Sequence, residues 1–212
     1  MDDRKPALED FLLFAFILGI FVLLSLFCTP KAEGANPYPA ICKIDMGEWT
    51  GSGTLIAVDD NAGLILSCRH VAVRTGSQAD VFWPGAGGQL TSATAYYVDP
   101  GNGFTSDISC FVTTRPKGVK PLTVTQFDDT QGPWVGLGYR GDHLRMSITG
   151  EATAKGTLIR CPVPAIGGMS GGPLLDKKGR IVGVVVGSTD DFSIAVTGKP
   201  IQDAIRIFKN GF

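Results

Sequence analysis

The chain has 212 residues and carries 19 basic and 20 acidic side chains, so its formal net charge is −1. This length allows one sizeable domain, or two small barrels that share a core. The balanced charge, with no basic stripe, argues against nucleic acid as the main partner. Glycine is abundant, at 28 residues, and the apolar runs are short, which is typical of a turn-rich all-β chain.

Residues 11–28, FLLFAFILGIFVLLSLFC, form a long apolar stretch near the N-terminus. As a helix this stretch would extend about 27 Å, close to the thickness of the hydrocarbon core of a bilayer. The residues before it mix acidic side chains with Arg4 and Lys5, unlike the positively charged start of a signal peptide. We therefore expect an uncleaved membrane anchor, and the alternatives are a cleaved signal peptide and a buried helix.

The basic residues around this stretch predict its orientation. Arg4 and Lys5 precede it and Lys31 follows it, which favours a cytoplasmic N-terminus. The large C-terminal part would then lie outside the cytoplasm, in the periplasm or the extracellular space. If the stretch were cleaved as a signal peptide, that part would instead be secreted. Residues 29–40 contain three prolines and predict an extended linker, so the folded domain is expected to begin near Ile41.

The five cysteines allow two interpretations. Cys28 lies at the end of the apolar stretch, where it would face lipid or carry an acyl group. The other four, which would form two disulfides in an exported domain or else act as small buried apolar side chains, are Cys42, Cys68, Cys110 and Cys161. No CxxC motif or Cys/His pair has the spacing typical of metal ligands, so we expect neither a metal nor a cofactor.

From Gly51 onward, short apolar or alternating runs are separated by Gly, Pro and Asp. Without amphipathic helices between them, such runs favour antiparallel barrels. We expect two six-stranded β-barrels, at about residues 41–116 and 131–200, joined by a crossover at 116–131. The tail has Pro at its start and apolar residues at three- and four-residue steps, which predicts a short helix at about 200–209.

Residues 164–175, PAIGGMSGGPLL, place four glycines around one serine, Ser170. Because glycine loses more backbone freedom on folding than other residues, this stretch is either a tight turn or a loop that directs backbone N–H groups at a nucleophile. A serine nucleophile requires a base. Of the two histidines, His70 directly follows the strand-like run GLILSC, whereas His143 has a polar, turn-like context and is expected at the surface.

A catalytic histidine also needs a carboxylate partner. Asp107 directly precedes an apolar run, whereas Asp99 begins an Asp-Pro-Gly turn, so Asp107 is the better candidate. GMSGG also matches the nucleophile motif of α/β-hydrolases, but no histidine follows Ser170, which excludes that fold. The subtilisin order, with the acid before the histidine, belongs to a fold with alternating helices, and this sequence does not predict such helices. The order His70, Asp107, Ser170 is that of the chymotrypsin barrels.

Four blocks of sequence resemble the trypsin-like (chymotrypsin-fold) serine proteases, most closely the HtrA/Deg-type bacterial branch. The first block ends in a histidine, the second contains an Asp-Pro turn and an aspartate, the third is a Ser-Gly-Gly loop with a hairpin, and the last ends in a helix. These blocks are residues 51–72, 93–114, 167–188 and 192–205. After the last block no length remains for a PDZ domain, so none is expected.

The resemblance implies a serine endopeptidase that acts on protein or peptide substrates. It implies His70 as general base, Asp107 as its orienting partner and Ser170 as the nucleophile that forms an acyl-enzyme. It also implies an oxyanion hole formed by the backbone N–H groups of Gly168 and Ser170. Substrate would pair with a strand near residues 184–188, and the substrate-binding residues implied are Ile166, Gly167, Val186, Gly187 and Ser188.

Two positions depart from the family pattern. Met169 stands where the family usually has Asp or Asn, so activation by an ion pair with a newly cleaved N-terminus is not expected. Pro164 stands where trypsin itself has Asp, which argues against cleavage after Arg or Lys and favours a small or medium apolar side chain. The alternatives to a peptidase are a catalytically inactive peptide-binding module of the same fold and an esterase that uses the same serine.

Overall fold

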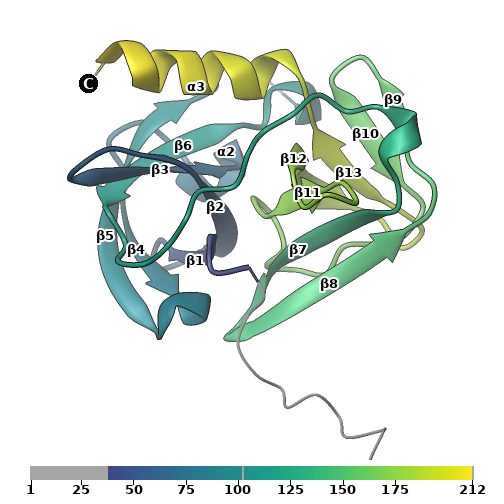
Figure 1. The fold of residues 1–212 in the computed structure, drawn as a ribbon. Helices are drawn as coiled ribbons and strands as arrows, with labels where there is room; N and C mark the ends of the chain where they lie inside the picture. Colours follow the sequence, from purple (N-terminus) through teal and green to yellow (C-terminus); the bar gives the residue numbers. More distant parts are fainter. Residues whose placement is uncertain (1–37, 102, 212) are drawn as a thin grey trace, which may run out of the picture. The chain divides into compact units, whose positions relative to one another are not determined.

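The structure is a computed structural model that describes residues 38–101 and 103–211 (Figure 1). The predicted membrane segment, residues 11–28, lies outside these residues, as does most of the predicted linker. Across the two described ranges, no helix is long and apolar enough to cross a membrane. The all-β fold expected from the sequence is confirmed for this part of the chain, which folds as two β-structures in succession.

The first β-structure is a closed antiparallel barrel of six strands, in the order β1-β2-β3-β6-β5-β4. Its strands have alternating or continuous apolar residues, because one face or both faces pack in the interior. Leu64, Trp83 and Phe111 are among the side chains that are fully buried there. The strands are β1 (Ile41–Asp45), β2 (Thr50–Val58), β3 (Ala62–Ser67), β4 (Gln78–Trp83), β5 (Gln89–Val98) and β6 (Ser109–Thr114).

Three short helical segments interrupt this barrel, and two of them carry residues of the candidate site. Helix α2 (Arg69–Ala72) follows β3 directly, and the 3₁₀ segment η2 (Phe104–Ser106) precedes β6. The third segment is η1 (Pro84–Ala86). Because β3 and β6 are paired in register, with Ser67 opposite Ser109, the chain segments at these strand ends lie side by side.

The second β-structure is a seven-stranded sheet in the order β8-β7-β11-β12-β13-β10-β9. Its strands are β7 (Trp134–Arg140), β8 (His143–Thr149), β9 (Thr153–Lys155), β10 (Leu158–Cys161), β11 (Pro173–Leu175), β12 (Ile181–Ser188) and β13 (Ser193–Val196). The expectation of a second six-stranded barrel is therefore wrong in detail, since β8 and β9 remain edge strands. Between them the Thr149 hydroxyl donates to Glu151 O (2.6 Å) and accepts from Glu151 N (3.1 Å). This local turn competes with strand pairing, and β9 has only three residues, all exposed.

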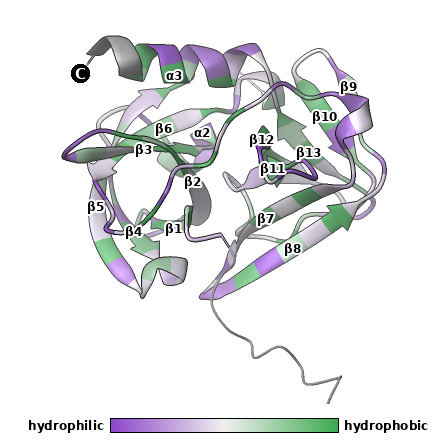
Figure 2. Ribbon diagram, viewed as in Figure 1, coloured by the Kyte–Doolittle hydropathy of each residue, from purple (hydrophilic) through white to green (hydrophobic). Residues whose placement is uncertain are grey.

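Residues 115–133 connect the two β-structures and include the 3₁₀ segment η3 (Asp129–Gln131). At Val124 this connection forms a parallel bridge with Ile181 of β12. The predicted C-terminal helix is present as α3 (Lys199–Gly211), and it buries Ile201, Ala204 and Phe208. Figure 2 shows polar and apolar residues interleaved along α3, as an amphipathic helix requires.

The β11–β12 hairpin holds the C-terminal end of the serine loop. Its turn is built around the buried Asp176 side chain, whose Oδ1 accepts hydrogen bonds from Lys178 N and Arg180 N, each at 2.9 Å. Arg180 Nε donates to Asp176 Oδ2 at 2.7 Å. Gly179 completes the turn with φ +73°. The strand that follows the serine loop is therefore fixed by a network local in sequence.

Candidate active site

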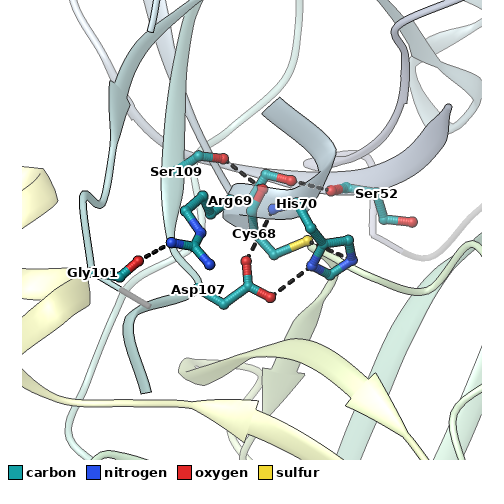
Figure 3. A network of polar contacts seen from close by, with 8 residues as sticks. Ser52, Cys68, Arg69, His70, Gly101, Asp107 and Ser109 are labelled. Carbon is teal, nitrogen blue, oxygen red and sulfur yellow. Dashed lines mark hydrogen bonds and ion pairs between the residues drawn. The ribbon is translucent and has the colours of Figure 1, made fainter. Parts of the chain in front are cut away.

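His70 and Asp107 form a close pair at the ends of β3 and β6 (Figure 3). The His70 ring nitrogen Nδ1 lies 2.6 Å from Asp107 Oδ2, and the His70 backbone N–H donates to Asp107 Oδ1 at 3.0 Å. The Asp107 carboxylate is buried, whereas the imidazole side chain is 46% exposed. Two contacts to one buried carboxylate fix both the position of helix α2 and the rotation of the imidazole.

This pairing determines which ring nitrogen of His70 is available for chemistry. Because an ionised carboxylate only accepts hydrogen bonds, Nδ1 carries the proton in neutral His70 and Nε2 carries the lone pair. Nε2 lies 3.4 Å from Cys68 Sγ. Within the described residues, no hydrogen bond joins Nε2 to the Ser170 hydroxyl. The structure thus pairs His70 with Asp107 and leaves the third predicted residue unbonded to them.

Cys68 was not predicted as part of the site. Burial raises the pKa of its thiol well above the usual value, and the negative charge of Asp107 raises it further. Cys68 is therefore a neutral thiol, able to donate weakly to Nε2. The fold brings ligand atoms of Cys68, His70 and Asp107 within 4.8 Å of one another, a proximity that the sequence spacing did not indicate. Asp107 is already engaged with Nδ1, so only two of these donors face each other, fewer than the three or four protein ligands typical of zinc.

The serine loop, residues 162–172, connects β10 to β11. Met169 N donates to Ile166 O at 3.0 Å, which closes a turn with Gly168 at its third position. Gly168 has φ +93°, a conformation that L side chains rarely adopt, and a Cβ there would lie 2.3 Å from Tyr139 O. This turn therefore requires glycine at residue 168, as the glycine-rich sequence suggested.

Ser170 lies where the serine loop meets the first barrel. Its carbonyl oxygen accepts a hydrogen bond from Ser52 N at 2.7 Å. The next residue, Gly171, has φ +85°, and a Cβ on it would lie 2.1 Å from Ser52 O and 3.2 Å from Cys68 N. The backbone beside Ser170 is therefore packed against the segment that leads from β3 into His70, although these residues are about a hundred positions apart in the sequence.

A cleft of about 380 Å³ lies beside the His70–Asp107 pair. It is lined by Arg69, His70, Gly103, Phe104, Asp107 and Val186. Phe104 is 51% exposed and packs near β12, since a Cβ on Gly187 would lie 2.8 Å from its ring. Sequence reasoning did not single out Phe104, because a lone aromatic residue in a loop carries no distinctive pattern.

The residues predicted to bind substrate lie around this cleft and the serine loop. Val186 is at a register shift of β12 and has no partner residue in β13, so its backbone lies outside that ladder. Ser188 accepts a hydrogen bond from Ala165 N at 2.9 Å, which ties the end of β12 to the serine loop. Ile166 is 42% exposed. Gly167 has open space around its Cα.

A second, very small cavity lies under the serine loop. Its volume is about 10 Å³. Its walls include Ala165 and Met169 of the loop and Val185 of β12, and no charged residue lines it. Met169 is 1% exposed, and its sulfur accepts a weak hydrogen bond from Ile166 N at 3.4 Å. Met169 therefore fills the space behind the turn that contains Gly168.

The remaining predicted residues are also placed. His143 is exposed at the start of β8, as expected for a surface histidine. Asp99 accepts a hydrogen bond from Gly101 N at 2.8 Å, the local turn role expected for it. All four cysteines of the described residues are unpaired and buried, which agrees with the apolar interpretation rather than with disulfides. Burial raises the pKa of Cys110 to about 12 and that of Cys161 to about 11.

The matching family model and the serine proteases among the chain's structural neighbours support its assignment to the serine-type peptidases, which are hydrolases. The sequence model of the trypsin-like peptidase domain matches residues 51–184, so the chain belongs to the trypsin-like peptidase family. No curated protein matches the chain.

Several solved serine proteases share the fold. The serine protease of a human pathogenic astrovirus is 25% identical over 79% of this chain and 94% of its own, with a TM-score of 0.59. A Glu endopeptidase is 22% identical over 83% of this chain and 93% of its own, with a TM-score of 0.67. The Rv3671c protease of M. tuberculosis, in an inactive form, is 20% identical over 89% of this chain and 96% of its own, with a TM-score of 0.62.

Proposed function

We propose that this protein is a serine endopeptidase in which His70, Asp107 and Ser170 form the catalytic triad. The observation that carries the proposal is the 2.6 Å contact between His70 Nδ1 and Asp107 Oδ2, which turns Nε2 away from the carboxylate. A carboxylate in this position holds the imidazole in the tautomer that accepts a proton at Nε2, and it stabilises the imidazolium formed when it does so.

In the proposed reaction, Ser170 Oγ attacks the carbonyl carbon of the scissile peptide while its proton passes to His70 Nε2. The amine then leaves with that proton, and an acyl-enzyme on Ser170 remains. Water gives a proton to Nε2 and attacks the ester, and the second product leaves as Ser170 recovers its proton. In the resting structure Ser170 and His70 are not hydrogen-bonded, but such contacts are often loose before substrate binds.

The backbone N–H groups of Gly168 and Ser170 are proposed to form the oxyanion hole. The turn at Gly168, which only glycine can adopt without strain, supports this assignment. Two such donors stabilise the negative charge that develops on the carbonyl oxygen in the transition state. The cost of several glycines in one loop is then offset by catalysis.

Substrate is proposed to pair as an extended strand with β12 near Val186, and to contact Ile166, Gly167, Gly187 and Ser188. The register shift at Val186 supports this placement, because Val186 has no partner residue in β13 and lines the cleft beside His70. The small, uncharged cavity behind the loop favours a small apolar side chain at the residue before the scissile bond. No side chain in its walls could form an ion pair with an acidic or a basic substrate residue.

We also propose, from the sequence alone, that residues 11–28 anchor the protein in a membrane with the peptidase domain outside the cytoplasm. The closest relationship within the family is proposed to be to the HtrA/Deg-type branch, on the basis of the four sequence blocks. Secretion after signal cleavage is the alternative for location. Protease digestion of intact cells or spheroplasts, followed by detection of the domain, separates an outside location from an inside one.

One observation favours a second candidate function, an inactive peptide-binding module. His70 Nε2 contacts Cys68 Sγ at 3.4 Å instead of the Ser170 hydroxyl. If this contact persisted with substrate bound, the base would not reach the nucleophile. Such a protein would bind peptides in the cleft without cleaving them.

The test is reaction of the full chain, solubilised in detergent, with a fluorophosphonate probe, followed by peptide mapping. We expect labelling at Ser170 alone, and loss of labelling in Ser170→Ala and His70→Ala. His143→Ala is the matched control, because it removes an exposed histidine far from Asp107 and should label like the wild type. A folded wild-type protein that never labels would favour the binding module.

A further inference from the structure

Ser52 is a fully buried polar residue that the proposed reaction does not use. It lies on β2 in the first barrel, between two glycines in the run TGSGTL. It is 116 positions before Gly168 in the sequence. A buried hydroxyl on a barrel strand is usually satisfied by its own barrel, so the partners of this one are informative.

The hydroxyl and the backbone N–H of Ser52 both bond to the second half of the chain, whereas its carbonyl bonds within the first barrel. The hydroxyl donates to Gly168 O at 2.7 Å and accepts from Tyr139 N, also at 2.7 Å. The backbone N–H donates to Ser170 O at 2.7 Å. The Ser52 carbonyl in turn accepts a hydrogen bond from Ser67 Oγ at 2.7 Å, which fixes Ser52 itself within the first barrel.

These contacts fall on the two residues whose N–H groups are proposed to form the oxyanion hole. Ser52 holds the carbonyl of Gly168 and the carbonyl of Ser170, the residues on either side of Met169. Because each peptide group is planar, holding the carbonyl oxygens limits how the peptide planes of this turn can rotate. The N–H groups in those two planes belong to Met169 and Gly171. The N–H groups of Gly168 and Ser170 are one Cα away from the held carbonyls, so only rotation about the φ and ψ angles of these two residues can redirect them.

The other anchor of the turn is apolar. Met169 is buried behind it and makes only a weak sulfur contact at 3.4 Å with Ile166 N, in place of the charged pair that an Asp would form. Ser52 therefore supplies polar contacts to Gly168 and Ser170 themselves, whereas β12 holds the end of the loop through Gly171 N to Val185 O at 2.7 Å.

We propose that Ser52 is a positioning residue that keeps the Gly168 and Ser170 N–H groups directed at the oxyanion. This inference rests on the proposed role of Ser170. Ser52 touches neither substrate nor the reacting atoms, and it acts through the turn. Its effect should therefore appear in the rate of the chemical step rather than in substrate binding.

The test compares Ser52→Ala with Thr113→Val in the full chain. Thr113 is a matched control: it is buried in the same barrel, and its hydroxyl contacts Thr91 Oγ1 at 2.8 Å and Ser92 O at 3.0 Å, away from the serine loop. Both changes remove one buried hydroxyl. We expect kcat of Ser52→Ala to fall at least about tenfold, with KM within about twofold of wild type, because removal of one oxyanion donor costs about 10²–10³. Thr113→Val should lose stability but keep kcat.

Hydrogen exchange supplies a readout that does not depend on catalysis. In Ser52→Ala the amides of residues 166–172 should exchange faster than in wild type, and in Thr113→Val they should not. If the wild-type protein fails to label with fluorophosphonate, the proposed function fails, and exchange at residues 166–172 still decides whether Ser52 holds the turn. Wild-type kcat and unchanged exchange in folded Ser52→Ala would overturn the inference.

Ser52→Cys covers the case in which Ser52→Ala does not fold. The thiol fills the site but donates only weakly, so kcat should again fall while the fold is kept. A folded Ser52→Cys protein with wild-type kcat would also overturn the inference.

Discussion

Replacing Gly168 with alanine tests the turn that holds the proposed oxyanion hole. Gly168 has φ +93°, and alanine there loses about 1–2 kcal/mol from the backbone conformation alone. The added Cβ would also lie 2.3 Å from Tyr139 O, well inside van der Waals contact. Since Tyr139 belongs to β7 and is itself fixed by Ser52, the turn must move by about 1 Å to relieve the contact.

A displacement of this size acts strongly on catalysis. Moving a catalytic group by about 1 Å can reduce the rate about 10²-fold, which corresponds to about 2.7 kcal/mol of transition-state stabilisation. We therefore expect the rate of Ser170 labelling and kcat/KM for a peptide ester to fall about 10²-fold in Gly168→Ala. Circular dichroism and thermal unfolding establish that the variant remains folded at the assay temperature.

Gly150→Ala is the control for this experiment. Gly150 has no positive φ, and a Cβ on it meets nothing within 4 Å, so this variant should label like the wild type. If folded Gly168→Ala labelled within about threefold of wild type, the Gly168 N–H would not belong to the oxyanion hole, and the reasoning from the turn geometry would be refuted.

Two further outcomes follow from the structure. Met169→Ala should lower the free energy of unfolding in urea by about 2–5 kcal/mol, because it empties a site that already adjoins a cavity. Met169→Leu keeps most of the volume and should cost less than about 1.5 kcal/mol. Equal losses in the two variants would contradict a packing role for Met169. Burial alone would raise the pKa of Asp176, but hydrogen bonds, mainly from Arg180, outweigh burial and lower the pKa. The ionised carboxylate therefore stabilises the fold above the unfolded pKa of about 3.9, and this contribution is lost as the pH falls further. Asp176→Asn should therefore lose about 1–3 kcal/mol at pH 7, a difference that shrinks below about pH 4 and would be absent if the hairpin network were not formed.

The sequence predicted the parts of the molecule that depend on local pattern and chain order. Alternating apolar runs predicted the all-β fold, and the apolar spacing from Ile201 to Phe208 predicted α3. His70 and Asp107 were selected because each lies where a strand begins or ends, and the structure places them 2.6 Å apart. The glycines around Ser170 indicated a constrained turn, and Gly168 indeed adopts positive φ.

The parts that the sequence did not predict depend on contacts between distant residues. Nothing local distinguishes Ser52 from any serine in a glycine-rich strand, because its role comes from partners more than eighty positions away. Cys68 was expected to be either a disulfide partner or a small core side chain, and only the fold brings it to Nε2 of His70. The open second sheet was not predicted because apolar runs indicate strands but do not indicate which strands pair, and here β8 and β9 remain at the edges.

The link from Ser52 to Gly168 and Ser170 has a consequence for when the site forms. During synthesis the first barrel leaves the ribosome before the serine loop, and domains generally fold as units in that order. The serine loop cannot take its final shape until Ser52 is in place and the strands on either side of the loop, β10 and β11, have emerged. Contacts between residues so distant in sequence form late in folding. If Ser170 is the nucleophile, as proposed, a nascent chain or a fragment of either half would lack a competent one. The newly made protein could then not digest itself or its neighbours before folding is complete.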